Sequence, residues 1–271
     1  MRSSFLPASP ADTDSAPSTL PCRIEVEADV RRWEALYARL PVPALTQASA
    51  YGDAKAVESG WRVERLVFQL GARPVAVCLV LVRCVFGLPV AARINRGPLF
   101  LSASPADADI EVVYGALRRR WRFGRRGVLF LAPGLADSDG HRRILQRLGF
   151  RPRGVSGWRS AVLDLRRPAA ELRRGLASNW RSHLNRAERN GLAFELSRTP
   201  EALEWILARH AGHMRDKGFA GTSVAFLQAL ARRAPDDVFV ARAHLEGAPL
   251  AGMILCRFGS RAEYFIGWYG A

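Results

Sequence analysis

Arginines recur at helical spacing near the middle of the chain. Arg167, Arg174 and Arg181 are seven residues apart, close to two helical turns, so they share one face of a helix predicted over residues 169–189. The same basic face is widened by Arg173, Arg186 and Arg189. Because a guanidinium fork binds two phosphate oxygens at once, this face predicts a phosphate-bearing substrate.

The neighbouring segments indicate how this helix is positioned. Residues 158–165 alternate as a strand does, Pro168 suits the first helical turn, and Gly191 suits a helix C-cap. The apolar stripe that we expect to face the core consists of Leu172, Leu176 and Leu184. A strand followed by a long basic helix therefore links the two halves of the chain.

Hydrophobic periodicity predicts the remaining elements. In the first half we expect helices at 30–40, 47–57, 110–122 and 140–148, and strands at 63–70, 75–83, 88–94 and 128–131, with 75–83 covered on both faces and 128–131 buried. In the second half we expect helices at 201–214 and 223–233 and strands at 238–243, 250–258 and 262–268. Mixed helices and strands of this kind predict an α/β or α+β protein.

Two stretches of the chain repeat each other. LVFQLGARPVAVCLVLVRCVFG in the first half and VFVARAHLEGAPLAGMILCRFG in the second both read strand, Gly/Pro turn, apolar strand, Arg and Phe-Gly. Their prolines, Pro74 and Pro249, are 175 residues apart (249 − 74). We therefore predict a duplicated meander at 63–95 and 238–269.

The second copy lacks a counterpart of residues 98–165. We therefore expect a second unit that is incomplete at its C-terminus and leaves a strand edge open. The apolar side chains expected to be exposed there are Ile254, Phe265, Ile266, Trp268 and Tyr269.

Composition indicates a globular chain with two domains. The sequence has 271 residues, 49% of them hydrophobic, and a formal charge of +15. Lys55 and Lys217 are the only lysines, and the arginines are spread over the whole chain instead of gathering in a tail. The charge therefore favours an anionic partner without specifying nucleic acid.

The cysteines and the apolar runs favour a cytoplasmic protein. The four cysteines, Cys22, Cys78, Cys84 and Cys256, form no CxxC pair, so we expect free thiols in a reducing compartment. Residues 1–22 have no apolar signal core and read as a disordered leader. The most apolar run, 75–90, is too short and too interrupted for a transmembrane segment.

Several of these motifs resemble one protein family. The strand ending LDL, the EL that follows, Arg181 and the run RAERNG resemble the FemA/FemB/FemX family of peptidoglycan-bridge aminoacyltransferases, which are built from tandem GNAT-type acyltransferase domains. The segment containing Gln47, Tyr51 and Lys55 resembles the family's Q…W/Y…K pattern, and Arg96-Gly97-Pro98 resembles its RGP motif.

The resemblance implies a fold and a domain organisation. It implies tandem GNAT-like domains with mixed, mostly antiparallel central sheets. The first domain would span residues 23–165, the linking basic helix 166–191, and the second, truncated domain 192–271.

The resemblance also implies an activity. The chain would transfer an aminoacyl or acetyl group to an amine of a peptidoglycan precursor, with aminoacyl-tRNA or acyl-CoA as cosubstrate and no tightly bound cofactor. Lys55 would contact a substrate phosphate, although it reads equally well as a surface lysine. Arg181 would bind the substrate, with Arg174 and Asn185 as further candidates.

The implied partners follow from this activity. They are a diphosphate-linked cell-envelope precursor and tRNA, with peripheral membrane contact through a lipid-linked substrate. The rival hypothesis is a non-catalytic, degenerate GNAT module that binds an anionic partner such as tRNA.

Residues for the chemical step are few. Acyl transfer to an amine needs a base, and the candidates are Glu263 and Tyr264, on opposite faces of one strand, and Asp216. Two positions depart from the family, Ala132 in place of an acidic residue and Phe226 in place of a tyrosine. The glycine-rich loop with which GNAT domains bind coenzyme A is also missing from the sequence.

A metal site is not expected. His210, His213 and Asp216 share one helix face at three-residue spacing, but the spacing is not HExxH and a fourth ligand is not evident.

Overall fold

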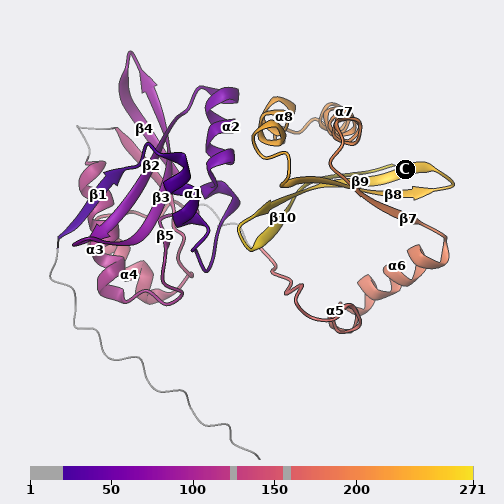
Figure 1. Cartoon of the computed structure of the whole chain (residues 1–271), viewed down its shortest axis with the longest axis horizontal. Helices are drawn as coiled ribbons and strands as arrows, with labels where there is room; N and C mark the ends of the chain where they lie inside the picture. Colours follow the sequence, from indigo (N-terminus) through magenta and orange to yellow (C-terminus); the bar gives the residue numbers. More distant parts are fainter. Residues whose placement is uncertain (1–20, 123–126, 155–159, 271) are drawn as a thin grey trace, which may run out of the picture.

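Two β-sheets form the framework of the chain (Figure 1). The computed structural model describes residues 21–122, 127–154 and 160–270. The first sheet has the order β1 (Cys22–Val26), β2 (Arg62–Leu70), β3 (Arg73–Val85), β4 (Leu88–Asn95) and β6 (Val128–Ala132), with β5 (Leu99–Phe100) paired to β3. The second has the order β10 (Arg261–Tyr269), β9 (Ala248–Phe258), β8 (Val238–Leu245) and β7 (Ala193–Ser197). Among the strand pairs of the described residues, only β4–β6 is parallel, which confirms the mixed, mostly antiparallel sheets.

Helices cover both faces of the first sheet. The 3₁₀ helix η1 (Leu45–Gln47), α1 (Val30–Tyr37) and α2 (Ser49–Ser59) lie against one face, and α3 (Asp107–Arg120) and α4 (Asp139–Arg147) lie against the other. Residues 75–82 of β3 are all buried, as the continuous apolar run predicts. In the second unit, α7 (Pro200–Lys217) and α8 (Val224–Arg233) cover one face.

The duplication is confirmed and is larger than the sequence indicates. The succession β1–α1–α2–β2–β3–β4 recurs as β7–α7–α8–β8–β9–β10, with the same strand order. In the first hairpin Gln69 pairs with Pro74, and in the second His244 pairs with Pro249. In each hairpin the residue after this proline, Val75 or Leu250, has no partner on the preceding strand. The β-bulge is therefore repeated as well.

One hydrophobic core continues from the first unit into the second. Helix α2 packs against α8, and the shared core includes Trp33 and Leu79 from the first unit and Leu227 and Ile254 from the second. Ile254 and Ile266 are thus buried, contrary to the expected exposure, because α7 and α8 cover that face. Tyr269 is 79% exposed, as predicted, whereas Phe265 and Trp268 are half-buried.

The segment that links the units differs from its prediction. Residues 160–165 form no strand and are almost wholly exposed, because no neighbouring strand pairs with them; residues 158 and 159 lie outside the described part. The long helix is two helices, α5 (Ala169–Gly175) and α6 (Ser178–Arg189), separated by Leu176 and Ala177 in extended conformation. Leu172, Leu176 and Leu184 are only half-buried, so the expected core stripe is wrong.

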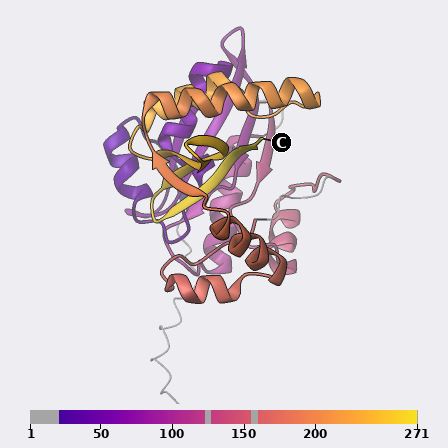
Figure 2. The same cartoon turned by 90° about the vertical axis from the view of Figure 1, so that its right-hand side faces the viewer.

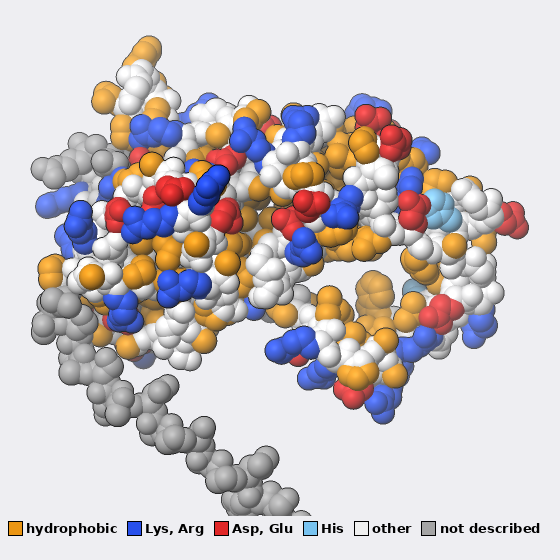
Figure 3. Space-filling model, in the orientation of Figure 1, with side chains coloured by type: hydrophobic (Ala, Val, Ile, Leu, Met, Phe, Trp, Pro, Cys, Tyr) orange, Lys and Arg blue, Asp and Glu red, His pale blue; other side chains and the backbone are white. Residues whose placement is uncertain are grey.

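Helices α5 and α6 lie on the side of the second sheet that faces away from α7 and α8, as two views show (Figures 1 and 2). In space-filling view the region between α5–α6 and this sheet is hollow (Figure 3). The sheet face turned toward this hollow carries exposed apolar side chains: Phe194, Leu196, Met253, Tyr264 and Tyr269. We call this the open face.

Three smaller predictions can be compared with the structure. Strand β6 alternates between exposed and half-buried residues, so it is not the buried strand expected at 128–131. All four cysteines are free. None of the described helices combines the length and the apolar character that crossing a bilayer requires.

Candidate functional site

Lys55 lies where the two units meet. Its Nζ is 4.1 Å from the centre of the Phe226 ring and 3.4 Å from Oε2 of Glu58. The Tyr51 ring meets the same Phe226 ring edge-on, with the centroids 5.2 Å apart. The ring of Phe265, on β10, is tilted against Phe226 with the centroids 6.0 Å apart. An ammonium over an aromatic face is stabilised by the ring quadrupole. Lys55 is thus held in a specific position and is only 24% exposed, unlike an ordinary surface lysine.

The start of α8 builds this junction. Ser223 is the N-cap residue, and its Oγ accepts a hydrogen bond from the Phe226 N–H, as N-cap serines do. The same hydroxyl donates to Oε1 of Glu58 at 2.8 Å. One serine therefore caps α8 and fastens it to the C-terminal end of α2.

Burial at the junction favours the neutral form of Tyr51. Burial raises the pKa of the Tyr51 phenol, Arg93 opposes the shift, and the carboxylates of Glu263 and Glu58 raise it further. A neutral phenol is a hydrogen-bond donor at physiological pH. Tyr51 could therefore donate to an acceptor oxygen on a bound substrate.

A second link between the units joins β10 to the loop after β4. Arg96 Nη1 lies 3.1 Å from Oε2 of Glu263, and its Nη2 donates to Oγ of Ser160 at 3.0 Å. Arg96 adopts a left-handed conformation, with φ of 53°, which turns its side chain toward the second unit. A Cβ at the next residue, Gly97, would lie 2.8 Å from the Gln47 side chain, so this position requires glycine.

Gln47, which is buried, anchors the start of that loop. Its fully buried Nε2 donates to the carbonyls of Leu79 and Asn95, at 3.2 and 2.8 Å, and its Oε1 accepts from the Leu79 N–H at 2.7 Å. This glutamine of the Q…W/Y…K pattern is therefore structural, whereas the tyrosine and the lysine face the junction.

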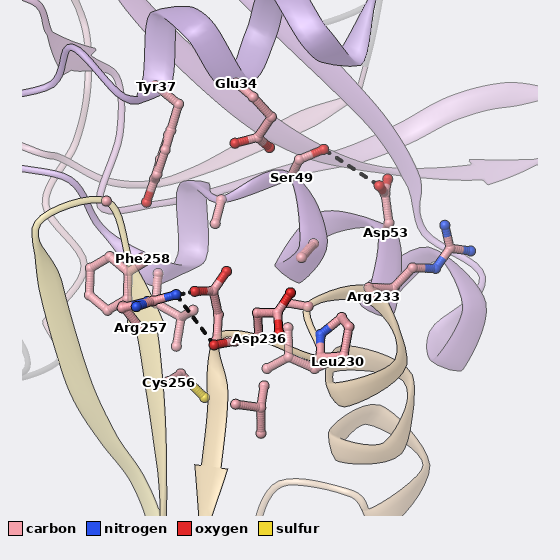
Figure 4. A pocket seen from close by; sticks show the side chains of 18 of the residues that line it. Glu34, Tyr37, Ser49, Asp53, Leu230, Arg233, Asp236, Cys256, Arg257 and Phe258 are labelled. Carbon is pink, nitrogen blue, oxygen red and sulfur yellow. Dashed lines mark hydrogen bonds and ion pairs between the residues drawn. The ribbon is translucent and has the colours of Figure 1, made fainter. Parts of the chain in front are cut away.

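A cavity of about 560 Å³ lies between the units at the opposite end of the α2–α8 pair (Figure 4). Three of its acidic side chains pair with arginines: Asp53 with Arg65 at 2.6 Å, Asp236 with Arg198 at 3.0 Å and Asp237 with Arg257 at 2.7 Å. Burial raises the pKa of a fourth, Glu34. Burial raises the pKa of the Cys256 thiol in its wall to about 12, so this thiol stays protonated and unreactive at neutral pH. The described side chains that line the cavity thus form a polar contact region between the units.

The remaining predicted substrate-binding residues lie apart from Lys55. Arg181, Arg174 and Asn185 are on α5–α6, on the far side of the second sheet from α2 (Figures 1 and 2). Arg181 Nη1 donates to the carbonyls of Arg174 and Leu176, both at 2.8 Å, and Asn185 accepts from Arg173. Because the helix is broken, the predicted single face that contains Arg167, Arg174 and Arg181 is not formed.

The three predicted bases are also separated. Glu263 faces the junction, whereas Tyr264, the next residue of β10, lies on the open face and is 59% exposed. This confirms that the two point to opposite faces. Asp216 is exposed near the end of α7. Only Glu263 therefore shares the junction with Lys55.

His210 and His213 each contact another group of the protein. His210 is buried, and its Nε2 lies 2.8 Å from the Thr222 carbonyl, while His213 packs edge-on against Phe219. Within the described ranges no group of three His, Cys, Asp or Glu side chains is placed to hold a metal ion.

The first unit has no gap between its parallel strands. β4 and β6 stay paired from Ala91–Val128 to Asn95–Ala132. The ladder then continues through the Gly97 N–H to the Ala132 carbonyl and the Gly134 N–H to the Gly97 carbonyl. The backbone N–H and C=O groups between these two strands are therefore hydrogen-bonded to each other and are not free to bind an acyl chain.

Sequence reasoning missed four junction residues: Glu58, Arg96, Ser223 and, in this role, Phe226. Arg96 lies in the RGP-like motif, and Phe226 was noted only as a departure from the family, so weak signals existed for both. Glu58 and Ser223 contact each other although they are 165 residues apart in sequence, and a local pattern cannot reveal such a contact.

Comparisons with known proteins agree with this architecture. Residues 174–271 match the family model of an acetyltransferase (GNAT) domain. The crystal structure of FemX superposes with a TM-score of 0.68 over 92% of this chain and 80% of that chain, at 14% sequence identity. A search of curated proteins gives no match. The chain therefore has a FemX-like fold over nearly its whole length, and its residues 174–271 are similar to GNAT acetyltransferase domains.

Proposed function

We propose that the chain is an acyltransferase that transfers an aminoacyl or acetyl group to an amine of a diphosphate-linked peptidoglycan precursor. The observation that carries the proposal is the FemX-like fold over nearly the whole chain, together with the acetyltransferase domain in its second half.

The junction around Lys55 is the proposed acceptor site. Lys55 would exchange its contact with Glu58 for a substrate phosphate while its ammonium stays over the Phe226 ring. The neutral Tyr51 phenol would donate a hydrogen bond to the same substrate. Glu263 would accept the proton of the attacking amine once the substrate has displaced Arg96.

The second unit is the proposed donor site. The outer edge of β10 is not paired with any of the strands in the described part of the chain, so its backbone amides can approach an acyl carbonyl. The amine nitrogen would attack that carbonyl, forming an amide while the ester bond of aminoacyl-tRNA, or the thioester bond of an acyl-CoA, breaks.

A donor screen tests the proposal. The full chain is incubated with a nucleotide-diphosphate-linked muropeptide and either labelled aminoacyl-tRNA or labelled acetyl-CoA, and label in the muropeptide is measured. We expect transfer from one donor. If neither donor supports transfer while tRNA binds the chain, the proposal fails and the non-catalytic binding module replaces it.

The two lysines provide a matched pair for the acceptor site. We expect Lys55→Ala to raise the KM for the muropeptide at least about tenfold, roughly 1.4 kcal/mol of lost binding, because a desolvated charge contact to phosphate is removed. Lys217→Ala, at an exposed position at the end of α7, should leave KM within about twofold. Equal effects of the two substitutions would refute the assignment of Lys55.

A further inference from the structure

The hairpin between β3 and β4 presents an apolar tip to solvent. Phe86 is 99% exposed, and its neighbours Val85 and Leu88 are 48% and 69% exposed. The hairpin projects beyond the body of the first unit (Figure 1), and its apolar tip is visible in the space-filling view (Figure 3). None of these side chains belongs to either hydrophobic core. The fold therefore gains no core packing from them.

The turn at this tip favours residues other than phenylalanine. Val85 pairs with Leu88, and the two residues between them, Phe86 and Gly87, have φ of 49° and 78°. A two-residue turn with positive φ at both positions favours Asn, Asp or Gly at the first. A bulky side chain in the left-handed region costs conformational energy. Phe86 is thus locally unfavourable as well as fully exposed.

The second unit supplies an internal control. Its β8–β9 hairpin has the same kind of turn, with Leu245 paired to Ala248 and φ of 50° and 82° at Glu246 and Gly247. A polar residue occupies the position that Phe86 occupies in the first unit. The backbone geometry therefore does not call for an aromatic side chain at this position.

The strands behind the tip are basic. No Asp or Glu occurs in the sequence between Glu64 and Asp107, and Arg83 and Arg93 are exposed on β3 and β4. The whole chain carries a formal charge of +15. The hairpin thus has an apolar turn and positively charged strands.

We propose that the β3–β4 hairpin inserts Val85, Phe86 and Leu88 into the interface of an anionic lipid bilayer, with Arg83 at the level of the headgroups. Aromatic rings favour the membrane interface, and arginines are attracted to anionic headgroups. The Val85–Leu88 pairing satisfies backbone groups at the tip, which lowers the cost of insertion. This inference does not depend on acyl transfer, although such docking would bring a lipid-linked acceptor near the protein.

A bilayer fits this tip better than a protein partner does. Stable protein interfaces bury about 1,200–2,000 Å² in total, more than three side chains on a narrow hairpin supply. Membrane association needs only a few inserted apolar groups when basic residues add electrostatic attraction.

Vesicle co-sedimentation of the full chain tests the proposal. Vesicles of phosphatidylcholine with increasing phosphatidylglycerol are used at fixed salt. We expect the bound fraction of the wild-type chain to rise with anionic lipid, and Phe86→Asn to lower the partition coefficient at least fivefold. Because Asn-Gly is a preferred pair in this turn, the variant should fold at least as well as the wild type.

The control is Phe194→Thr, which removes another exposed phenylalanine, on the open face of the second sheet. It should retain wild-type partitioning. The proposal is overturned if Phe86→Asn binds as the wild type does, if both substitutions lower binding equally, or if binding is independent of anionic lipid. A wild-type chain that is dimeric without lipid and becomes monomeric with Phe86→Asn would instead assign the tip to a contact between protein copies.

Discussion

At the scale of single residues, Gln47 shows how one buried amide can complete a sheet. On β3, the residues from Leu81 onward pair with β4, and Ala76 and Val77 pair with β5. Leu79 lies between these two paired stretches. No strand lies beside Leu79 on that side, so the Gln47 amide satisfies both its N–H and its carbonyl. The same amide reaches Asn95 and thereby positions the loop that carries Arg96.

We predict that Gln47→Leu lowers the free energy of unfolding by about 2–4 kcal/mol, because each buried backbone group left without a partner costs about 1–3 kcal/mol. Gln146→Leu, the same change at an exposed position on α4, should alter it by less than about 0.5 kcal/mol. Urea unfolding of both variants provides the measurement. A Gln47→Leu chain as stable as the wild type would show that the hydrogen bonds of the Gln47 amide contribute nothing to stability.

At the scale of elements, the break between α5 and α6 replaces a helix that the arginine spacing predicts. Gly175 has a low helix propensity and comes directly before the two extended residues. The carbonyls that the break exposes, those of Arg174 and Leu176, accept hydrogen bonds from Arg181. Arg181 thus holds the angle between the two helices, and Arg173 adds an ion pair with Glu188 at 2.9 Å.

We expect Arg181→Ala to loosen this corner. Amide hydrogen exchange in α5 and the first turn of α6 should accelerate roughly fivefold, which corresponds to about 1 kcal/mol of lost hydrogen bonding. Arg189→Ala, at an exposed position in the last turn of α6, serves as the control and should leave exchange unchanged. If both variants exchange alike, the corner is held by something other than the Arg181 side chain.

At the scale of the whole molecule, the duplicated units differ in how their sheets are covered. On the first sheet, Ala76, Cys78 and Val80 are buried by α3 and α4. The repeated register places Ala251, Met253 and Leu255 at the equivalent positions of the second sheet. These residues belong to the open face, where Met253 is 39% exposed; α7 and α8 pack on the opposite face of this sheet.

This open face should bind hydrophobic probes. We predict that the double variant Phe194→Thr/Leu196→Thr lowers the fluorescence of a bound hydrophobic dye by more than about half. Its melting temperature should stay close to that of the wild type, because threonine suits a strand and both residues are exposed already. Val162→Thr, at an exposed position outside the sheet, is the control. Unchanged dye fluorescence in the double variant would show that the face is covered in solution.

The amino-acid sequence by itself determined the repeated units and most of their elements. Strands β2, β3 and β8–β10 and helices α1, α2, α7 and α8 begin and end close to their predicted limits, because burial on one or both faces leaves a local period in the sequence. The Gly/Pro turns also marked the two equivalent hairpins. Lys55 and Glu263 could likewise be singled out as candidates from residue type and motif.

Tertiary structure alone decided the short strands, the helix break and the composition of the site. β1, β5 and β7 have between two and five residues, and pairing with a longer neighbour defines each of them more than its own pattern does. Glu58 meets Ser223, and Arg96 meets Glu263, across 165 and 167 residues of sequence. A side chain's partner at that separation depends on how the two units pack, and a local pattern of residues carries no information about that packing.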